Sequence, residues 1–95
     1  MVMLPDQVRF DMIPSTVLHD PELSSKEKVL YALLLSYAWH NNERFPGYDA
    51  LARDMGLDVQ SVKWILLGLI HHELISKDDQ DIYRIKRLTG LASDV

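Results

Sequence analysis

Residues 48–70, YDALARDMGLDVQSVKWILLGLI, decide the fold of this chain. Leu51 and Met55 lie four residues apart and therefore share one apolar face of a helix. Ala52, beside them, is small enough to let a second helix pack closely. Gly56 can adopt the left-handed conformation that ends a helix without a side-chain penalty. The first half of the stretch thus predicts a short helix followed by a glycine turn.

The second half of the stretch predicts another helix with two different faces. We expect this helix to start near Val59, because the Asp58 carboxylate can accept hydrogen bonds from the free amides of a first helical turn. Apolar residues at three- and four-residue spacing form the face that must be buried: Val62, Ile65, Leu66, Leu69 and Ile70. The opposite face carries Gln60, Lys63, Trp64, Leu67 and His71. The pattern favours a helix-turn-helix over a helical hairpin of some other all-α domain.

The flanking segments add a long helix and a β-hairpin. Ser24 followed three residues later by Glu27 is a capping box, which predicts a helix running to about His40. Two short β-type runs, 74–77 and 82–85, surround a polar turn and predict a hairpin. A hairpin directly after a helix-turn-helix is a wing. The expected fold class is therefore mainly α with a small β-hairpin wing, a winged helix-turn-helix.

A chain of 95 residues is long enough for one hydrophobic core, so we expect one domain over 1–95. We place the helix-turn-helix at 48–72 and the wing at 74–86, and we expect the tail at 87–95 to be frayed. The chain has no cysteine, which excludes disulfides and is typical of a reducing compartment. With no signal peptide and no apolar run long enough for a bilayer, we expect a cytoplasmic protein without a membrane partner.

The charge balance is unusual for a nucleic-acid-binding domain. Fourteen acidic residues against ten basic ones give a net charge of −4. Domains that hold DNA by its phosphates usually carry a basic face. Any DNA affinity of this chain must therefore depend on where its few cations lie.

The long helix carries a second apolar stripe in addition to its main one. This stripe consists of Tyr31, Leu35 and Trp39, spaced four residues apart. A helix that is apolar on nearly all sides is buried on both faces. The stripe is thus a candidate protein interface, and packing inside one chain and packing across a dimer both remain open.

Residues 10–85 resemble the winged helix-turn-helix domains of phage and plasmid replication initiators and of DnaD-like primosome proteins. The matching features are the Ile13-Pro14 start, the Leu23-Ser24 cap, the Phe45-Pro46 return to the core and the Leu51-Ala52 to Gly56 turn. The resemblance implies double-stranded DNA binding in replication initiation or transcriptional regulation, as a homodimer and for a phage, plasmid or other mobile element. It also implies replication or other nucleoprotein machinery as a partner.

The second motif helix and the segments beside it carry the candidate DNA contacts. Gln60 can pair with an adenine edge, and Lys63 can reach a guanine or a phosphate. The candidate base-reading residues are Gln60, Ser61, Lys63 and Trp64. The candidate phosphate contacts are Arg44, Arg53, Lys77, Arg84, Lys86 and Arg87. The alternative is that all of these are ordinary solvated surface residues.

Two features of the pattern favour a protein partner instead. Trp64 and Leu67 are large apolar residues on the face that should be exposed, so they are candidates to contact thymine methyl groups or another protein. Alternatively, the wing or the tail covers them. The turn residues Asp78, Asp79 and Asp81 would repel phosphates, so we expect this wing not to enter a minor groove. The alternative function is a protein-interaction module, as a subunit of a nucleoprotein assembly or an inhibitor that docks on another protein.

The sequence gives little support to an enzyme. His71, His72 and Glu73 are adjacent, whereas a helical zinc site needs its ligands on one face. There is no glycine-rich phosphate loop and no recognisable nucleophile turn. We therefore expect no catalytic residue, no metal and no cofactor.

Overall fold

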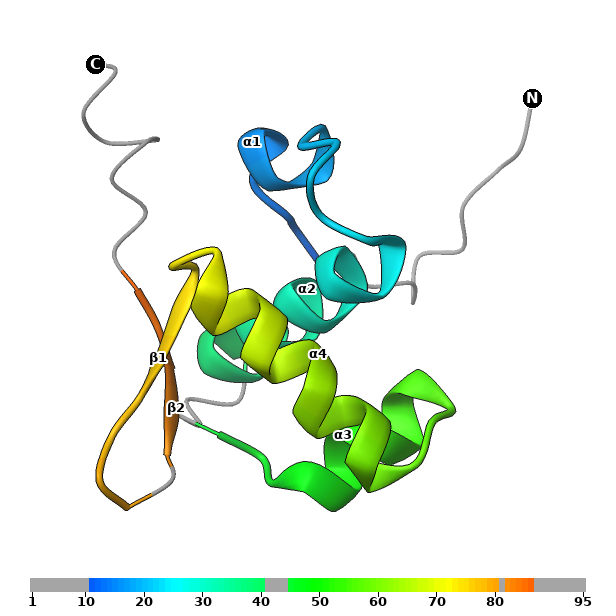
Figure 1. The fold of residues 1–95 in the computed structure, drawn as a ribbon, viewed down its shortest axis with the longest axis vertical. Coiled ribbons are helices and arrows are strands. Elements are labelled where there is room, and N and C mark those ends of the chain that lie inside the picture. Colours follow the sequence, from blue (N-terminus) through cyan, green and yellow to red (C-terminus); the bar gives the residue numbers. More distant parts are fainter. Residues whose placement is uncertain (1–10, 41–44, 81, 87–95) are drawn as a thin grey trace.

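The four described helices pack around one core, and a β-hairpin lies at their side (Figure 1). The computed structural model describes residues 11–40, 45–80 and 82–86, except for the side chains of Trp39 and His40. The described elements are α1 (Ser15–Leu18), α2 (Ser25–His40), α3 (Tyr48–Met55), α4 (Val59–His71), β1 (Ile75–Lys77) and β2 (Tyr83–Ile85). This order confirms the predicted winged helix-turn-helix.

The start of α2 is fixed by the predicted capping box. The Glu27 amide donates to Ser24 Oγ at 3.1 Å, and the Ser24 amide donates to Glu27 Oε1 at 2.8 Å. The same Glu27 side chain lies against Gly68 of α4, where a Cβ atom would collide with the carboxylate. The glycine therefore lets α4 approach the capped end of α2 closely.

The turn between α3 and α4 follows the predicted glycine geometry. Gly56 has a φ of +69°, and the Leu57 amide donates to the Ala52 carbonyl at 3.0 Å. This is the Schellman arrangement that satisfies the last carbonyls of a helix. Asp58 does occupy the N-cap of α4, but its side chain makes no capping bond to a backbone amide. The expectation for that carboxylate was wrong, because it accepts a hydrogen bond from the Ser61 hydroxyl instead.

The end of α4 repeats this geometry without a glycine. Glu73 has a φ of +62°, a left-handed conformation that costs energy for any residue with a Cβ atom. The Leu74 amide donates to the Leu69 carbonyl at 3.0 Å, and the Glu73 amide donates to the Ile70 carbonyl at 2.9 Å. The same hydrogen-bonded turn that ends α3 therefore sends the chain from α4 into β1.

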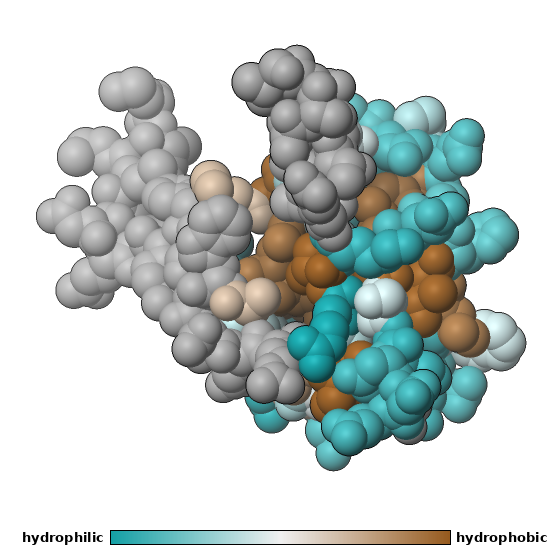
Figure 2. All heavy atoms as spheres, turned by 90° about the vertical axis from the view of Figure 1, so that its left-hand side faces the viewer, coloured by the Kyte–Doolittle hydropathy of each residue, from teal (hydrophilic) through white to brown (hydrophobic). Residues whose placement is uncertain are grey.

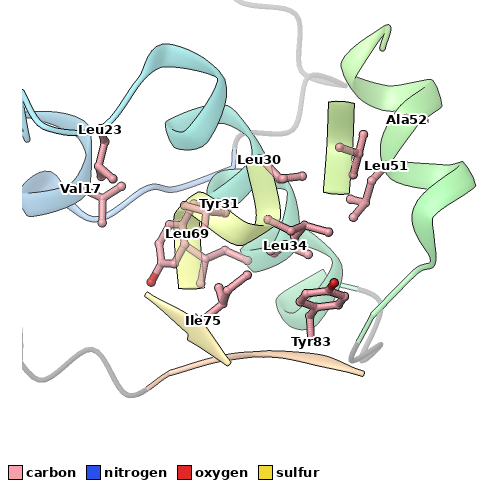
Figure 3. Close-up of a cluster of buried hydrophobic side chains, with 13 residues drawn as sticks. Val17, Leu23, Leu30, Tyr31, Leu34, Leu51, Ala52, Leu69, Ile75 and Tyr83 are labelled. Carbon is pink, nitrogen blue, oxygen red and sulfur yellow. The ribbon is translucent and has the colours of Figure 1, made fainter. Parts of the chain in front are cut away.

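The inner face of α4 forms the centre of the core. Val62, Leu66 and Leu69 are fully buried, and α4 contacts α2, α3 and β1. Figure 3 shows Leu69 close to residues of α2, with Ile75 of β1 below them. The other buried apolar residues come from all parts of the described chain: Val17, Leu23, Leu30, Tyr31, Leu34, Leu35, Leu51, Ala52, Ile75 and Tyr83.

The second stripe of α2 belongs to this core. Tyr31 is fully buried and Leu35 is only 9% exposed within a single chain. Of the two alternatives left open for this stripe, packing inside one chain therefore holds for Tyr31 and Leu35, because the fold itself already covers them. Burial raises the pKa of the Tyr31 hydroxyl to about 12. The side chain of Trp39, the third residue of the stripe, lies outside the described residues.

The two strands of the wing pair in antiparallel fashion. Ile75 lies opposite Ile85, Ser76 opposite Arg84 and Lys77 opposite Tyr83. Because side chains alternate along a strand, Ile75, Lys77, Tyr83 and Ile85 share the face toward the helices, and Ser76 and Arg84 share the outer face. Figure 2, viewed from the wing side, shows apolar residues in the middle of this side of the molecule, with hydrophilic residues mainly to the right of them and below them.

We expect Glu73→Gly to stabilise the fold by about 1 kcal/mol, because glycine adopts a positive φ without the Cβ penalty. Equilibrium denaturation with urea would measure this change. Glu73→Ala is the matched control, since alanine also lacks the carboxylate but keeps the penalty. An equal gain in both variants would contradict the explanation, because it would assign the effect to the lost charge.

Candidate functional site

The outer face of α4 is exposed along the length of the helix. Gln60, Lys63, Trp64, Leu67 and His71 are all exposed along it, as their spacing predicted. Among the 13 residues of α4, Lys63 is the only lysine, and the residues between it and His71 are uncharged. None of the 13 residues carries a carboxylate. In a chain with a net charge of −4, the residues of this helix thus add no acidic group to its exposed face, and the nearest carboxylate in the sequence is that of the N-cap residue Asp58.

Two large apolar side chains dominate this face. Trp64 is 65% exposed and Leu67 is 50% exposed, three residues apart on the same side of α4. The wing does not cover them. The alternative that the tail covers them concerns residues 87–95, which lie outside the described part of the chain. Exposed apolar pairs of this kind are typical of contact surfaces.

Ser61 stands at the edge of this face and is held by a neighbour. Its hydroxyl donates a hydrogen bond to Asp58 Oδ1, and this bond is the main reason why the pKa of the Asp58 carboxyl lies below its ordinary value. The hydroxyl proton is thus engaged within the protein. While that bond persists, Ser61 can offer a ligand an acceptor oxygen but not a donor.

An aromatic cluster joins the wing to the helix-turn-helix. Phe45 lies before α3, Tyr48 is the first residue of α3, and Tyr83 is the first residue of β2. Ring centroids are 4.8 Å apart for Phe45 and Tyr83, 5.5 Å for Phe45 and Tyr48, and 5.9 Å for Tyr48 and Tyr83. The Tyr48 and Tyr83 hydroxyls share a hydrogen bond of 3.0 Å. This cluster was not predicted from the sequence, because local spacing cannot show that residues 35 positions apart meet.

Two lysines lie over the rings of this cluster. Lys63 Nζ of α4 is 4.9 Å from the centroid of Tyr48, and Lys77 Nζ of β1 is 5.7 Å from the centroid of Tyr83. Both distances are within the range of a cation–π contact. Lys63, a candidate base-reading residue, and Lys77, a candidate phosphate contact, thus lie at the same aromatic cluster.

Other candidate phosphate contacts lie beside carboxylates. Arg84 Nη2 is 3.4 Å from Asp78 Oδ2 on the wing, and Lys86 Nζ is 3.8 Å from Glu73 Oε1. Arg53 is exposed on α3. Arg44 and Arg87 lie outside the described residues, so the structure places four of the six candidates.

The turn of the wing depends on one of its acidic residues. Asp78 Oδ1 accepts hydrogen bonds from the Gln80 amide at 2.9 Å and from the Ile82 amide at 3.0 Å. The Ile82 amide bond is the main reason why the pKa of the Asp78 carboxyl lies below its ordinary value. Asp78 therefore holds the turn together, which the sequence analysis did not foresee. Asp79 is exposed, and Asp81 lies outside the described residues.

Two histidines, His71 and His72, lie next to each other at the end of α4. The rings of His71 and His72 are 5.6 Å apart and nearly perpendicular. Within the described part of the chain, no group of three or more histidine, aspartate or glutamate side chains is placed to hold a metal ion. No described helix combines the length and the apolar character needed to cross a membrane.

Comparison with known proteins gave one match. A family model with the description "Helix-turn-helix domain" matches residues 22–75, which is more than half of the chain. The matched segment begins just before α2 and ends at the first residue of β1, so it includes the whole of α3 and α4. The searches of curated proteins and of solved structures found no match.

We expect Asp78→Ala to open the turn of the wing, because the Gln80 and Ile82 amides lose their acceptor. Amide hydrogen exchange at these two residues should become faster, whereas Asp79→Ala, which removes the adjacent exposed carboxylate, should leave it unchanged. Equal exchange in both variants would show that the Asp78 carboxylate does not hold the turn.

The same carboxylate makes the turn sensitive to acid. Because the folded state lowers the Asp78 pKa, its stabilising effect is complete above the ordinary value of 3.8 and is lost as the pH falls through the lower folded-state pKa. An NMR titration of the Ile82 amide should therefore show a midpoint below 3.8. A midpoint at or above that value would show that the Asp78 carboxylate does not stabilise the folded turn.

Proposed function

The chain belongs to the helix-turn-helix domain family, and on that premise we propose that it binds double-stranded DNA through the outer face of α4. Membership of this family indicates DNA binding in general. The observation that carries the proposal is the exposed face of α4, which combines Gln60, Lys63, Trp64 and Leu67 and to which the residues of the helix itself add no carboxylate. In a helix-turn-helix, the second helix of the motif is the one that enters the major groove.

Each residue of this face has a suitable chemical role. The Gln60 amide can donate to and accept from an adenine edge, which is a bidentate contact. Trp64 and Leu67 can pack against thymine methyl groups, and Ser61 can accept a hydrogen bond from a base amino group. Lys63 adds the positive charge that attracts the DNA. The combination favours a site that contains A·T base pairs.

The acidic composition of the chain does not prevent this mode of binding. The carboxylates of Asp78 and Glu73 each lie within 4 Å of a cation of the chain. The field near the DNA depends mainly on the charges nearest to the phosphates, since salt screens distant charges within about 10 Å. We therefore expect affinity for random DNA that is modest and strongly dependent on salt.

The biological role that we propose follows the family resemblance of residues 10–85. It is replication initiation or transcriptional regulation in the cytoplasm, for a phage, plasmid or other mobile element, alongside other nucleoprotein components. A homodimer is part of this proposal, because dimers read two half-sites one helical turn apart. Tyr31 and Leu35 are buried within one chain, so a dimer contact has to use other residues.

A protein-docking function is the second candidate, and a specific observation favours it. Trp64 and Leu67 together form an exposed apolar pair, and tryptophan is a frequent anchor in protein interfaces. Both functions would use the same helix face. They differ in their response to salt, because an apolar anchor loses little affinity when salt is added and a phosphate contact loses much.

We expect the double variant Lys63→Ala and Trp64→Ala to lose at least about tenfold in affinity for random duplex DNA, since it removes a cation and an aromatic contact. Fluorescence anisotropy at several salt concentrations would measure the affinity and its salt dependence.

The matched control is Lys26→Ala with Val29→Ala, which removes an exposed lysine and an exposed apolar residue from α2. This control should bind like the wild type. Absence of duplex binding by the wild type at low salt would reject the DNA proposal and support the protein-docking alternative.

A further inference from the structure

We propose that Asp58 and Ser61 together form an acceptor-only contact for one base pair, and that this contact selects cytosine in the major groove where α4 begins. The inference rests on the proposed DNA binding and deepens it, because it names a base that the site prefers. It also gives a role in DNA recognition to Asp58, which the sequence analysis treated only as a helix cap.

The first step is the position of Asp58. This residue is the N-cap of α4, and it is exposed. In a helix-turn-helix, the N-terminal residues of the second helix are the ones that reach the base edges. The Asp58 carboxylate makes no capping bond to a backbone amide, and its partner is the Ser61 side chain instead. A carboxylate that does not cap the helix therefore lies at the end of α4 that would enter the groove.

The second step is the hydrogen bond between Asp58 and Ser61. The Ser61 hydroxyl donates its single proton to Asp58 Oδ1. All remaining lone pairs of the hydroxyl and of the carboxylate are acceptors. The same bond is the main reason why the pKa of the Asp58 carboxyl lies below its ordinary value, so this group is charged at neutral pH. The two side chains together therefore offer a ligand acceptors and no donor.

The third step is the distribution of charge around α4. Ser61 and Gly68 are seven residues apart and therefore lie on the same side of the helix. The Glu27 side chain lies against Gly68, so the carboxylates of Asp58 and Glu27 are both on this side. Lys63, two residues after Ser61, extends from the opposite side. Phosphates are consequently attracted on the Lys63 side and repelled on the Asp58 side, which leaves the bases as ligands for Asp58.

The fourth step is the chemistry of the base edges. In the major groove, cytosine presents an amino donor, whereas the edges of guanine and thymine present acceptor atoms. Adenine presents an amino donor beside the acceptor N7, and an acceptor-only contact has nothing to donate to that atom. Cytosine therefore fits Asp58 and Ser61 best. Gln60 differs, because its amide both donates and accepts and so suits adenine.

The experiment uses the full chain to select bound sequences from a pool of DNA duplexes with a randomised central segment. We expect the wild type to select cytosine at one position. In Asp58→Asn this preference should fall about tenfold, which is the usual order of discrimination by one good base contact. The reason is that an amide is a weaker acceptor than a carboxylate and also donates. Asparagine is as good an N-cap residue as aspartate, so the fold should be retained.

The matched control is Asp79→Asn, which removes the same charge from the exposed turn of the wing. Its base preference should equal that of the wild type. At low salt, Asp58→Asn should also bind random duplexes more tightly than the wild type, because it removes a charge that repels phosphates. If Asp58→Asn gains affinity for all sequences but keeps the base preference of the wild type, Asp58 acts by repulsion alone and the cytosine contact is rejected.

The positioning role of Ser61 is tested by two variants. Ser61→Ala removes the hydroxyl that holds the carboxylate, so the preference for cytosine should weaken. Ser61→Thr keeps a hydroxyl at the same position and should preserve the preference. The base preference is the readout, because a loss of stability alone lowers affinity for all sequences equally. An unchanged preference in Ser61→Ala would overturn the role of Ser61.

The remaining outcomes separate this inference from the proposed function. If the wild type binds duplexes but shows no preference for cytosine that depends on Asp58, the contact is rejected and DNA binding stands. If the wild type binds no duplex even at low salt, both the cytosine contact and the DNA function are overturned.

Discussion

The structure depends above all on the burial of the inner face of α4. Val62, Leu66 and Leu69 are fully buried, and full burial of such a side chain is worth about 1.5–3 kcal/mol. The same helix contacts α2, α3 and β1, so it holds these three elements of the fold together. Because this face has to be inside, the opposite face has to be outside. The position of the candidate DNA-binding surface thus follows directly from the packing of the core.

The wing is coupled to this core at both of its ends. At the base, the left-handed Glu73 turns the chain so that Ile75 enters the core directly after α4. Further along the hairpin, Tyr83 packs against Tyr48 and Phe45 of the helix-turn-helix. The turn itself is held by the Asp78 carboxylate, which bonds two backbone amides. The acidic character of the wing is therefore partly a requirement of its own folding.

Features with a local physical cause could be predicted from the sequence. The Ser24 and Glu27 capping box, the Gly56 turn and the start of α4 near Val59 all depend on residues a few positions apart, and the structure agrees with them. Features that depend on contacts between residues far apart in the sequence could not be predicted. The contact between Tyr48 and Tyr83 and the burial of Tyr31 arise only when the helices and the wing pack together. The Asp58 carboxylate accepts a hydrogen bond from the Ser61 hydroxyl, which took the place of the expected backbone amides.

The central claim is that the outer face of α4 binds duplex DNA. NMR mapping of DNA contacts on the isotope-labelled protein tests this claim most directly. Titration with a random duplex at low salt should shift the Trp64 indole signal and the amides of Gln60 and Lys63 first. Signals of residues on the exposed side of α2, such as Lys26 and Val29, should stay in place. Shifts that concentrate on α2, or no shifts at all, would contradict the account.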